Sequence, residues 1–143
     1  MRRFAMRETV LLLVAISCSD SRRQGDATSA ARVVAQMRSG FIDCYNSALA
    51  TAPTMTGCAR LAILVGADGR VQRVAATSTG LSDSVVSCIR DRASRSVFDP
   101  PAGGHAAINF PIGLVPKGLS ESVKRDRIAL CESQTPMPDG NSL

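Results

Sequence analysis

The side chains of this sequence that could do chemistry are five cysteines and a single histidine. Cys18 stands apart, because it follows an apolar run, Thr9 to Ile16, that is itself preceded by three arginines. A basic start, an apolar stretch too short to span a bilayer and a small residue before a cysteine are typical of a bacterial lipoprotein signal. We therefore expect residues 1–17 to be a signal peptide and the thiol of Cys18 to carry a lipid.

Lipidation of Cys18 would place the chain in the cell envelope, anchored to a membrane through the lipid and facing the periplasm. Ala15 and Ser17 equally fit an ordinary signal-peptidase cut, which would export the chain without an anchor. The net charge is +5, and no run of Lys and Arg is interleaved with aromatic residues. We therefore expect no nucleic-acid partner.

The other four cysteines form an even set, and disulfides persist in the periplasm. They are Cys44, Cys58, Cys88 and Cys131, which allow three pairings. No Cys-x-x-Cys spacing occurs among them, which argues against a thioredoxin-like motif or a zinc knuckle. The alternative is four reduced cysteines that act as small buried hydrophobic residues.

Catalytic and metal-binding groups are sparse. His105 is the only histidine and stands in a glycine-rich stretch, so neither a site of paired histidines nor a triad with a second histidine can be built. A nucleophile pair of Cys44 with His105 would need Cys44 to be reduced. We expect no enzyme activity, no cofactor and no metal site.

The elements that position these cysteines begin with a polar tether over residues 18–29. A globular domain should follow over residues 30–116. An amphipathic helix is predicted for residues 30–52, interrupted near Gly40, because apolar side chains recur every fourth residue. These are Phe41, Tyr45 and Leu49, with Cys44 beside them.

Two β-prone runs follow, Leu61 to Val65 and Val71 to Ser78, and the Asp68-Gly69 pair between them predicts a hairpin. A second helix should begin after an N-cap at Ser82. Its buried stripe is predicted to be Val85, Ile89, Ala93 and Val97, with Cys88 adjacent. Alternating apolar residues then predict a third strand, which should be an edge strand or contain a bulge because it includes Pro111. They are Ile108, Phe110, Ile112 and Leu114.

The predicted fold is α+β, in the order helix, strand, strand, helix, strand, with two helices packed on one face of a small three-stranded antiparallel sheet. Cys44 and Cys88 both flank the buried stripe of their helices, so we expect them to pair. Cys58 and Cys131 would then pair by elimination. The tail, residues 117–143, should be partly helical and then disordered from Ser133.

Residues 41–116 resemble the AgmX/PglI C-terminal domain, a relative of the TonB C-terminal domain of envelope proteins. The matching features are Cys44-Tyr45, Leu61 to Val65, Gly69-Arg70-Val71, Ser78, Leu81, Val85 to Ile89, Phe98 and Phe110-Pro111-Ile112. The resemblance implies a TonB C-terminal-like fold and a small protein-interaction module.

The expected function is binding of an envelope protein, or of a second copy to form a homodimer, through an exposed sheet edge or a helix face. A partner strand would add to the edge that carries Ile108, Phe110 and Ile112, because unpaired backbone groups there offer hydrogen bonds. One alternative is a structural accessory subunit of an envelope complex. Another is a small-ligand carrier or enzyme, which would need a pocket with convergent polar groups.

Overall fold

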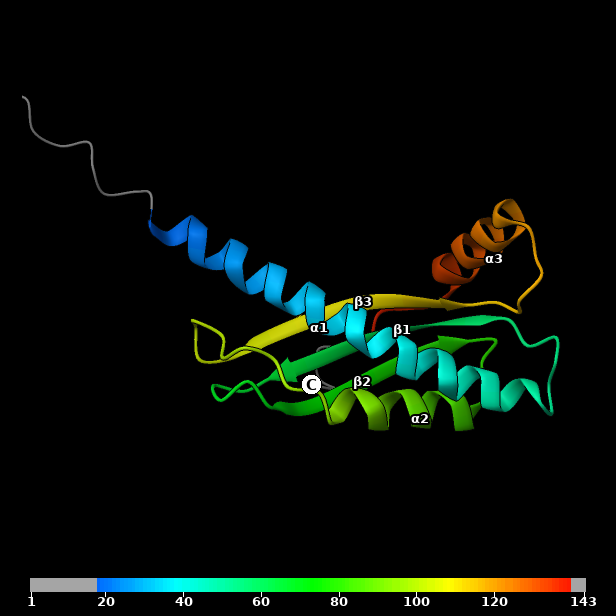
Figure 1. Cartoon of the computed structure of the whole chain (residues 1–143), viewed down its shortest axis with the longest axis horizontal. Coiled ribbons are helices and arrows are strands. Elements are labelled where there is room, and N and C mark those ends of the chain that lie inside the picture. Colours follow the sequence, from blue (N-terminus) through cyan, green and yellow to red (C-terminus); the bar gives the residue numbers. More distant parts are fainter. Residues whose placement is uncertain (1–17, 140–143) are drawn as a thin grey trace, which may run out of the picture.

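The computed structural model describes residues 18–139 as three helices and one antiparallel sheet (Figure 1). The elements are α1 (Cys18–Leu49), β1 (Gly57–Val65), β2 (Val71–Thr79), α2 (Asp83–Ser94), β3 (Ala106–Leu114) and α3 (Glu121–Gln134). The predicted α+β fold is therefore confirmed, and the chain adds one helix after the third strand.

The sheet has the strand order β2-β1-β3, so both β2 and β3 are edge strands. The predicted hairpin joins β1 to β2, where the N–H of Gly69 donates to the carbonyl of Gly66 over 3.0 Å. Gly69 has φ +81°, and a Cβ atom at this position would lie 2.1 Å from the carbonyl oxygen of Phe98. A glycine is needed here because of both its conformation and this close approach.

The core lies between the sheet and two helices, α1 and α2, which cover the same face. Alternate residues of β1 point into it, among them Leu61 and Ile63, which are fully buried. The ring of Phe41 on α1 stacks on that of Phe110 on β3, with centroids 6.5 Å apart. The core residues predicted on α2 are buried, apart from Val97.

Val97 is 63% exposed, so its predicted burial is wrong. Helix α2 ends at Ser94, three residues before Val97, and the chain then runs extended beside the hairpin. Val97 pairs with Arg70, and the N–H of Phe98 donates to the carbonyl of Gly69. These backbone bonds replace the last helical turn that the apolar spacing suggested.

The first helix differs from its prediction in two ways. It begins at Cys18 rather than near residue 30, so residues 18–29, the proposed tether, are helical and continuous with the rest of α1. The predicted interruption near Gly40 is wrong, because the helix continues through this residue. Instead, Arg92 of α2 lies against this residue, since a Cβ atom on Gly40 would be 3.0 Å from the Arg92 Cδ. In the part of the chain that the structure describes, no helix is long and apolar enough to cross a membrane.

Helix α3 covers one end of the opposite face of the sheet. Cys58 and Arg60 point away from the core, because side chains alternate along a strand, and both contact α3 or the residues after it. Ile128 packs on Gly113 of β3. Residues 135–139 were predicted to be disordered, but Thr135 is buried and the hydroxyl of Thr77 donates to the carbonyl of Pro136.

Candidate protein-binding edge

Two disulfides fix the scaffold, and both predicted pairings are present. Cys44–Cys88 joins α1 to α2, and Cys58–Cys131 joins β1 to α3. The Cα atoms are 5.9 Å apart in each pair. Because Cys44 is in a disulfide, it offers no thiol for a nucleophile pair with His105, which is exposed in the loop before β3.

Cys58 and Cys131 lie at the centre of a small polar cluster that attaches α3 to the sheet. Thr135 is 3% exposed, and its hydroxyl lies 3.3 Å from the sulfur of Cys58 and 2.9 Å from the hydroxyl of Thr79. Arg60 donates from Nη2 to the carbonyl of Glu132 over 2.9 Å, in the last turn of α3. A cation is favourable there, because carbonyl groups at a helix C-terminus lack helical partners.

Among the described residues, no group of three or more His, Cys, Asp or Glu side chains is arranged to hold a metal ion. Tyr45 is a buried residue of α1, and its phenol donates to the carbonyl of Met55. Burial raises the pKa of Tyr45 above its ordinary value, because the charged phenolate loses solvation. This hydrogen bond connects α1 to the loop before β1.

Strand β3 is at an edge of the sheet, with Pro111 inside it, as predicted. The three predicted edge residues, Ile108, Phe110 and Ile112, face the core and pack against it. Their side chains stabilise the strand, and the surface left open is the outer backbone edge. The exposed side chains of β3 are Ala107, Asn109 and Pro111.

The two edges of the sheet differ in charge and in cover. All nine residues of β3 are uncharged, whereas β2 contains Arg73 and the exposed Gln72. Beside β2, the C-terminal segment contributes a bond from Thr77 to the carbonyl of Pro136. Charged side chains on an edge strand discourage pairing with another strand. The β3 edge is therefore the one that suits an added strand.

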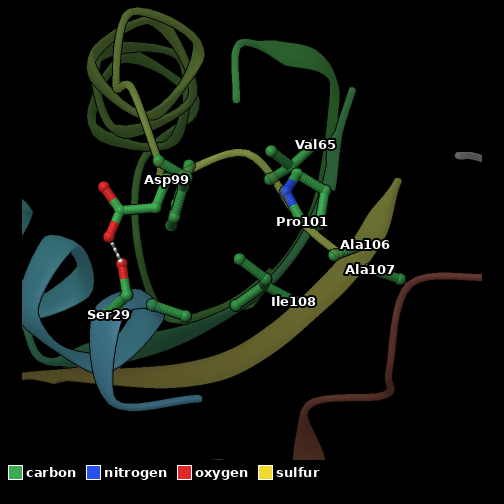
Figure 2. A pocket seen from close by; sticks show the side chains of 9 residues that line it. Ser29, Val65, Asp99, Pro101, Ala106, Ala107 and Ile108 are labelled. Atoms are coloured by element: carbon green, nitrogen blue, oxygen red, sulfur yellow. Dashed lines mark hydrogen bonds between the residues drawn. The ribbon is translucent and has the colours of Figure 1, made fainter. Parts of the chain in front are cut away.

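A cavity of about 190 Å³ lies at the beginning of β3 (Figure 2). Val65 and Ile108 point into it from the sheet, and Pro101 closes another side. At its rim, Ser29 of α1 donates to the carboxylate of Asp99, which also lies 3.4 Å from Arg32 Nη2. The chain leaves this space unfilled, because two of the side chains along it, those of Ala30 and Ala106, are only methyl groups.

No local pattern in the sequence indicates this cavity, since its lining comes from α1, β1, β3 and the loop after α2. The residue predicted to carry the lipid, Cys18, is the first residue of α1. The predicted signal peptide, residues 1–17, lies outside the described residues.

Comparisons of this chain with models of protein families, with curated proteins and with solved structures find no match. The resemblance to the AgmX/PglI C-terminal domain therefore stays a prediction.

Proposed function

We propose that this chain is a lipid-anchored protein-binding module of the cell envelope, which binds its partner by pairing a partner strand with the free edge of β3. The observation that carries the proposal is the nine-residue uncharged edge strand. A strand that adds to such an edge gains main-chain hydrogen bonds without the cost of burying a charge. The resemblance to the AgmX/PglI C-terminal domain, taken as a proposal, is consistent with a binding role.

The rest of the domain supports this use of β3. The strand pairs along its whole length with β1, and Phe110 is held by the ring of Phe41. Disulfides connect α1 to α2 and β1 to α3. A pre-formed edge loses less conformational entropy when it binds a partner than a mobile one would.

The proposed anchor is a lipid on Cys18, at the start of α1. A helix of 32 residues is about 48 Å long, and the first turns of α1 extend beyond the sheet (Figure 1). The sheet would then stand away from the membrane surface with β3 accessible to a partner. Full-length protein should sediment with membranes, and Cys18→Ala should release it into the aqueous fraction. A wild-type protein that stays soluble when membranes are pelleted would refute the anchor.

Photo-crosslinking in cells tests the binding edge. We would place p-benzoylphenylalanine at Ala107, which is exposed on β3, and identify the crosslinked protein by mass spectrometry. Asn109→Pro is the blocking variant: Asn109 is two residues from Pro111, so its N–H and the nitrogen of Pro111 point to the same side of the strand. Because an edge strand accommodates proline with that side facing solvent, the change should remove an outer donor and keep the ladder to β1.

The expected result is a discrete adduct that Asn109→Pro abolishes and the matched control Asn109→Ala retains, with both variants folded by circular dichroism. An adduct of twice the chain mass would identify the partner as a second copy. An adduct that Asn109→Pro leaves unchanged would refute strand pairing and favour a structural accessory subunit. Absence of any adduct would refute binding at this edge.

A further inference from the structure

We propose that the cavity at the beginning of β3 receives one large apolar side chain of the partner strand and thereby selects the partner's sequence. This inference rests on the proposed function, because it assumes that a strand pairs with β3. Main-chain bonds give affinity to an added strand but carry little sequence information. Specificity in this mode comes from pockets that hold alternate side chains.

The position of the cavity links it to the β3 edge. Its lining includes the first three residues of β3, Ala106 to Ile108, and Val65, which pairs with Ala106. Val65 and Ile108 belong to the core-facing side of the sheet, so the cavity lies on the side that α1 and α2 cover. A strand beside β3 would direct every second side chain to this same side. The methyl group of Ala106 leaves room for such a side chain to reach the cavity.

The chemistry of the cavity identifies the occupant as apolar. Its lining is almost entirely aliphatic and aromatic, including Val65, Phe98 and Ile108. The only charged residue in the lining, Asp99, is bonded by Ser29 and lies 3.4 Å from the guanidinium of Arg32. A charged side chain placed here would lose its solvation without gaining a free partner.

The size of the cavity identifies a single side chain. An apolar cavity of about 150 Å³ is large enough to bind benzene, and this one is about 190 Å³. It therefore suits the side chain of leucine, methionine or phenylalanine, but not a complete lipid acyl chain.

Peptide display tests the proposal even while the partner is unidentified. The probe is a library of random ten-residue peptides, selected against the folded domain with both disulfides intact. Ala30→Leu should fill the cavity from α1, and Ala31→Leu is the matched control, because Ala31 is the next residue but is exposed and does not line the cavity. Ala106→Leu fills the cavity from β3 and replaces Ala30→Leu if that variant does not fold.

The selected peptides should contain a large apolar residue at one fixed position. Replacing that residue by alanine should weaken binding to the wild type and to Ala31→Leu by about 10- to 30-fold, as for an anchor in a pocket. The cavity-filling variant should bind the original peptide about 10- to 30-fold more weakly, and the alanine substitution should then have little further effect, because both changes remove the same contact.

Failure of this inference can be told apart from failure of the proposed function. The cavity proposal alone would be overturned if the selected peptides protect β3 from deuterium exchange but share no apolar position, or if they bind equally to Ala30→Leu and to the wild type. Strand pairing, and the cavity proposal with it, would be overturned if no peptide is selected, or if the peptides bind Asn109→Pro and Asn109→Ala with equal affinity.

Discussion

Helix α3 should depend on the Cys58–Cys131 disulfide more than any other element depends on a single bond. Among the described residues of α3 itself, only Cys131 is buried, and Leu130 next to it is 61% exposed. Its other attachments include Ile128 packed on Gly113, the bond from Arg60 to Glu132, the bond from Arg127 to Thr56 and the bond from Thr135 to Thr79. We predict that Cys58→Ala with Cys131→Ala destabilises the domain and detaches α3.

The loop lengths give the magnitude. The two disulfides close loops with sequence separations of 73 for Cys58–Cys131 and 44 for Cys44–Cys88. The chain-entropy relation then gives about 4.4 and about 4.0 kcal/mol at 25 °C, so either loss should lower the free energy of unfolding by about 4 kcal/mol. A domain of this size is stable by about 5–15 kcal/mol, so the effect should be large.

Urea unfolding followed by circular dichroism would measure the loss, and hydrogen exchange would locate it. In the variant without Cys58–Cys131, the amides of α3 should exchange far faster than those of β1 and β3. The matched control, Cys44→Ala with Cys88→Ala, should show a similar loss of stability but no selective loss in α3, since that bond joins two helices that share the core. A change below about 1 kcal/mol would refute the entropy argument, and continued protection of α3 would refute its dependence on the bond.

Three further predictions concern single residues. Gly69→Ala should lower the free energy of unfolding in urea by about 1–3 kcal/mol, because Gly69 has a positive φ and a Cβ atom there would meet the carbonyl of Phe98. The control Gly103→Ala should be neutral, because a Cβ atom at that position would meet nothing closer than 4.0 Å. Equal effects of the two substitutions would refute the turn argument. Arg60→Met should lower the free energy of unfolding by about 1–3 kcal/mol, because the carbonyl of Glu132 loses a charged donor. The control Arg70→Met should change stability little, because Arg70 is exposed and its ion pair is at the surface. An Arg60→Met variant as stable as the wild type would show that the bond to Glu132 adds no net stability. Burial raises the pKa of Tyr45, so the folded state holds the phenol proton more tightly than the unfolded state does. The contribution of this group to stability should therefore be fully present below about pH 10 and should fall as the pH rises above it. Tyr45 is the only tyrosine, so its ultraviolet absorbance reports the titration directly, and Tyr45→Phe should remove this fall; a phenol that titrates at the ordinary pKa would contradict the burial argument.

Local signals predicted the hairpin and the edge strand well. The Asp68-Gly69 pair predicted the turn, and Gly69 does adopt the positive φ that such turns use. Pro111 predicted an edge strand or a bulge, because proline has no N–H to donate to a ladder, and β3 is indeed an edge strand. Both signals act within a few residues, so they do not depend on distant contacts.

Features that depend on distant contacts were missed or misjudged. Val97 fits the apolar spacing of α2, but hydrogen bonding between Phe98 and Gly69 ends the helix first. Helix α3 has a weak apolar stripe, so its exact bounds and its packing on Gly113 could not be read from periodicity. The cavity depends on alanines that come together only in the folded chain. Small side chains lining a hollow leave no pattern in sequence.

The order of the cysteines along the chain has a consequence for biogenesis. The native pairs interleave, because Cys58 lies inside the loop closed by Cys44 and Cys88 whereas Cys131 lies outside it. In an unfolded chain, Cys44 meets Cys58 more often than Cys88, since shorter loops close more readily. An oxidant that acts on the emerging chain would therefore form non-native bonds first. Efficient maturation then requires reshuffling by thiol exchange, so production of the native protein should depend on a disulfide isomerase.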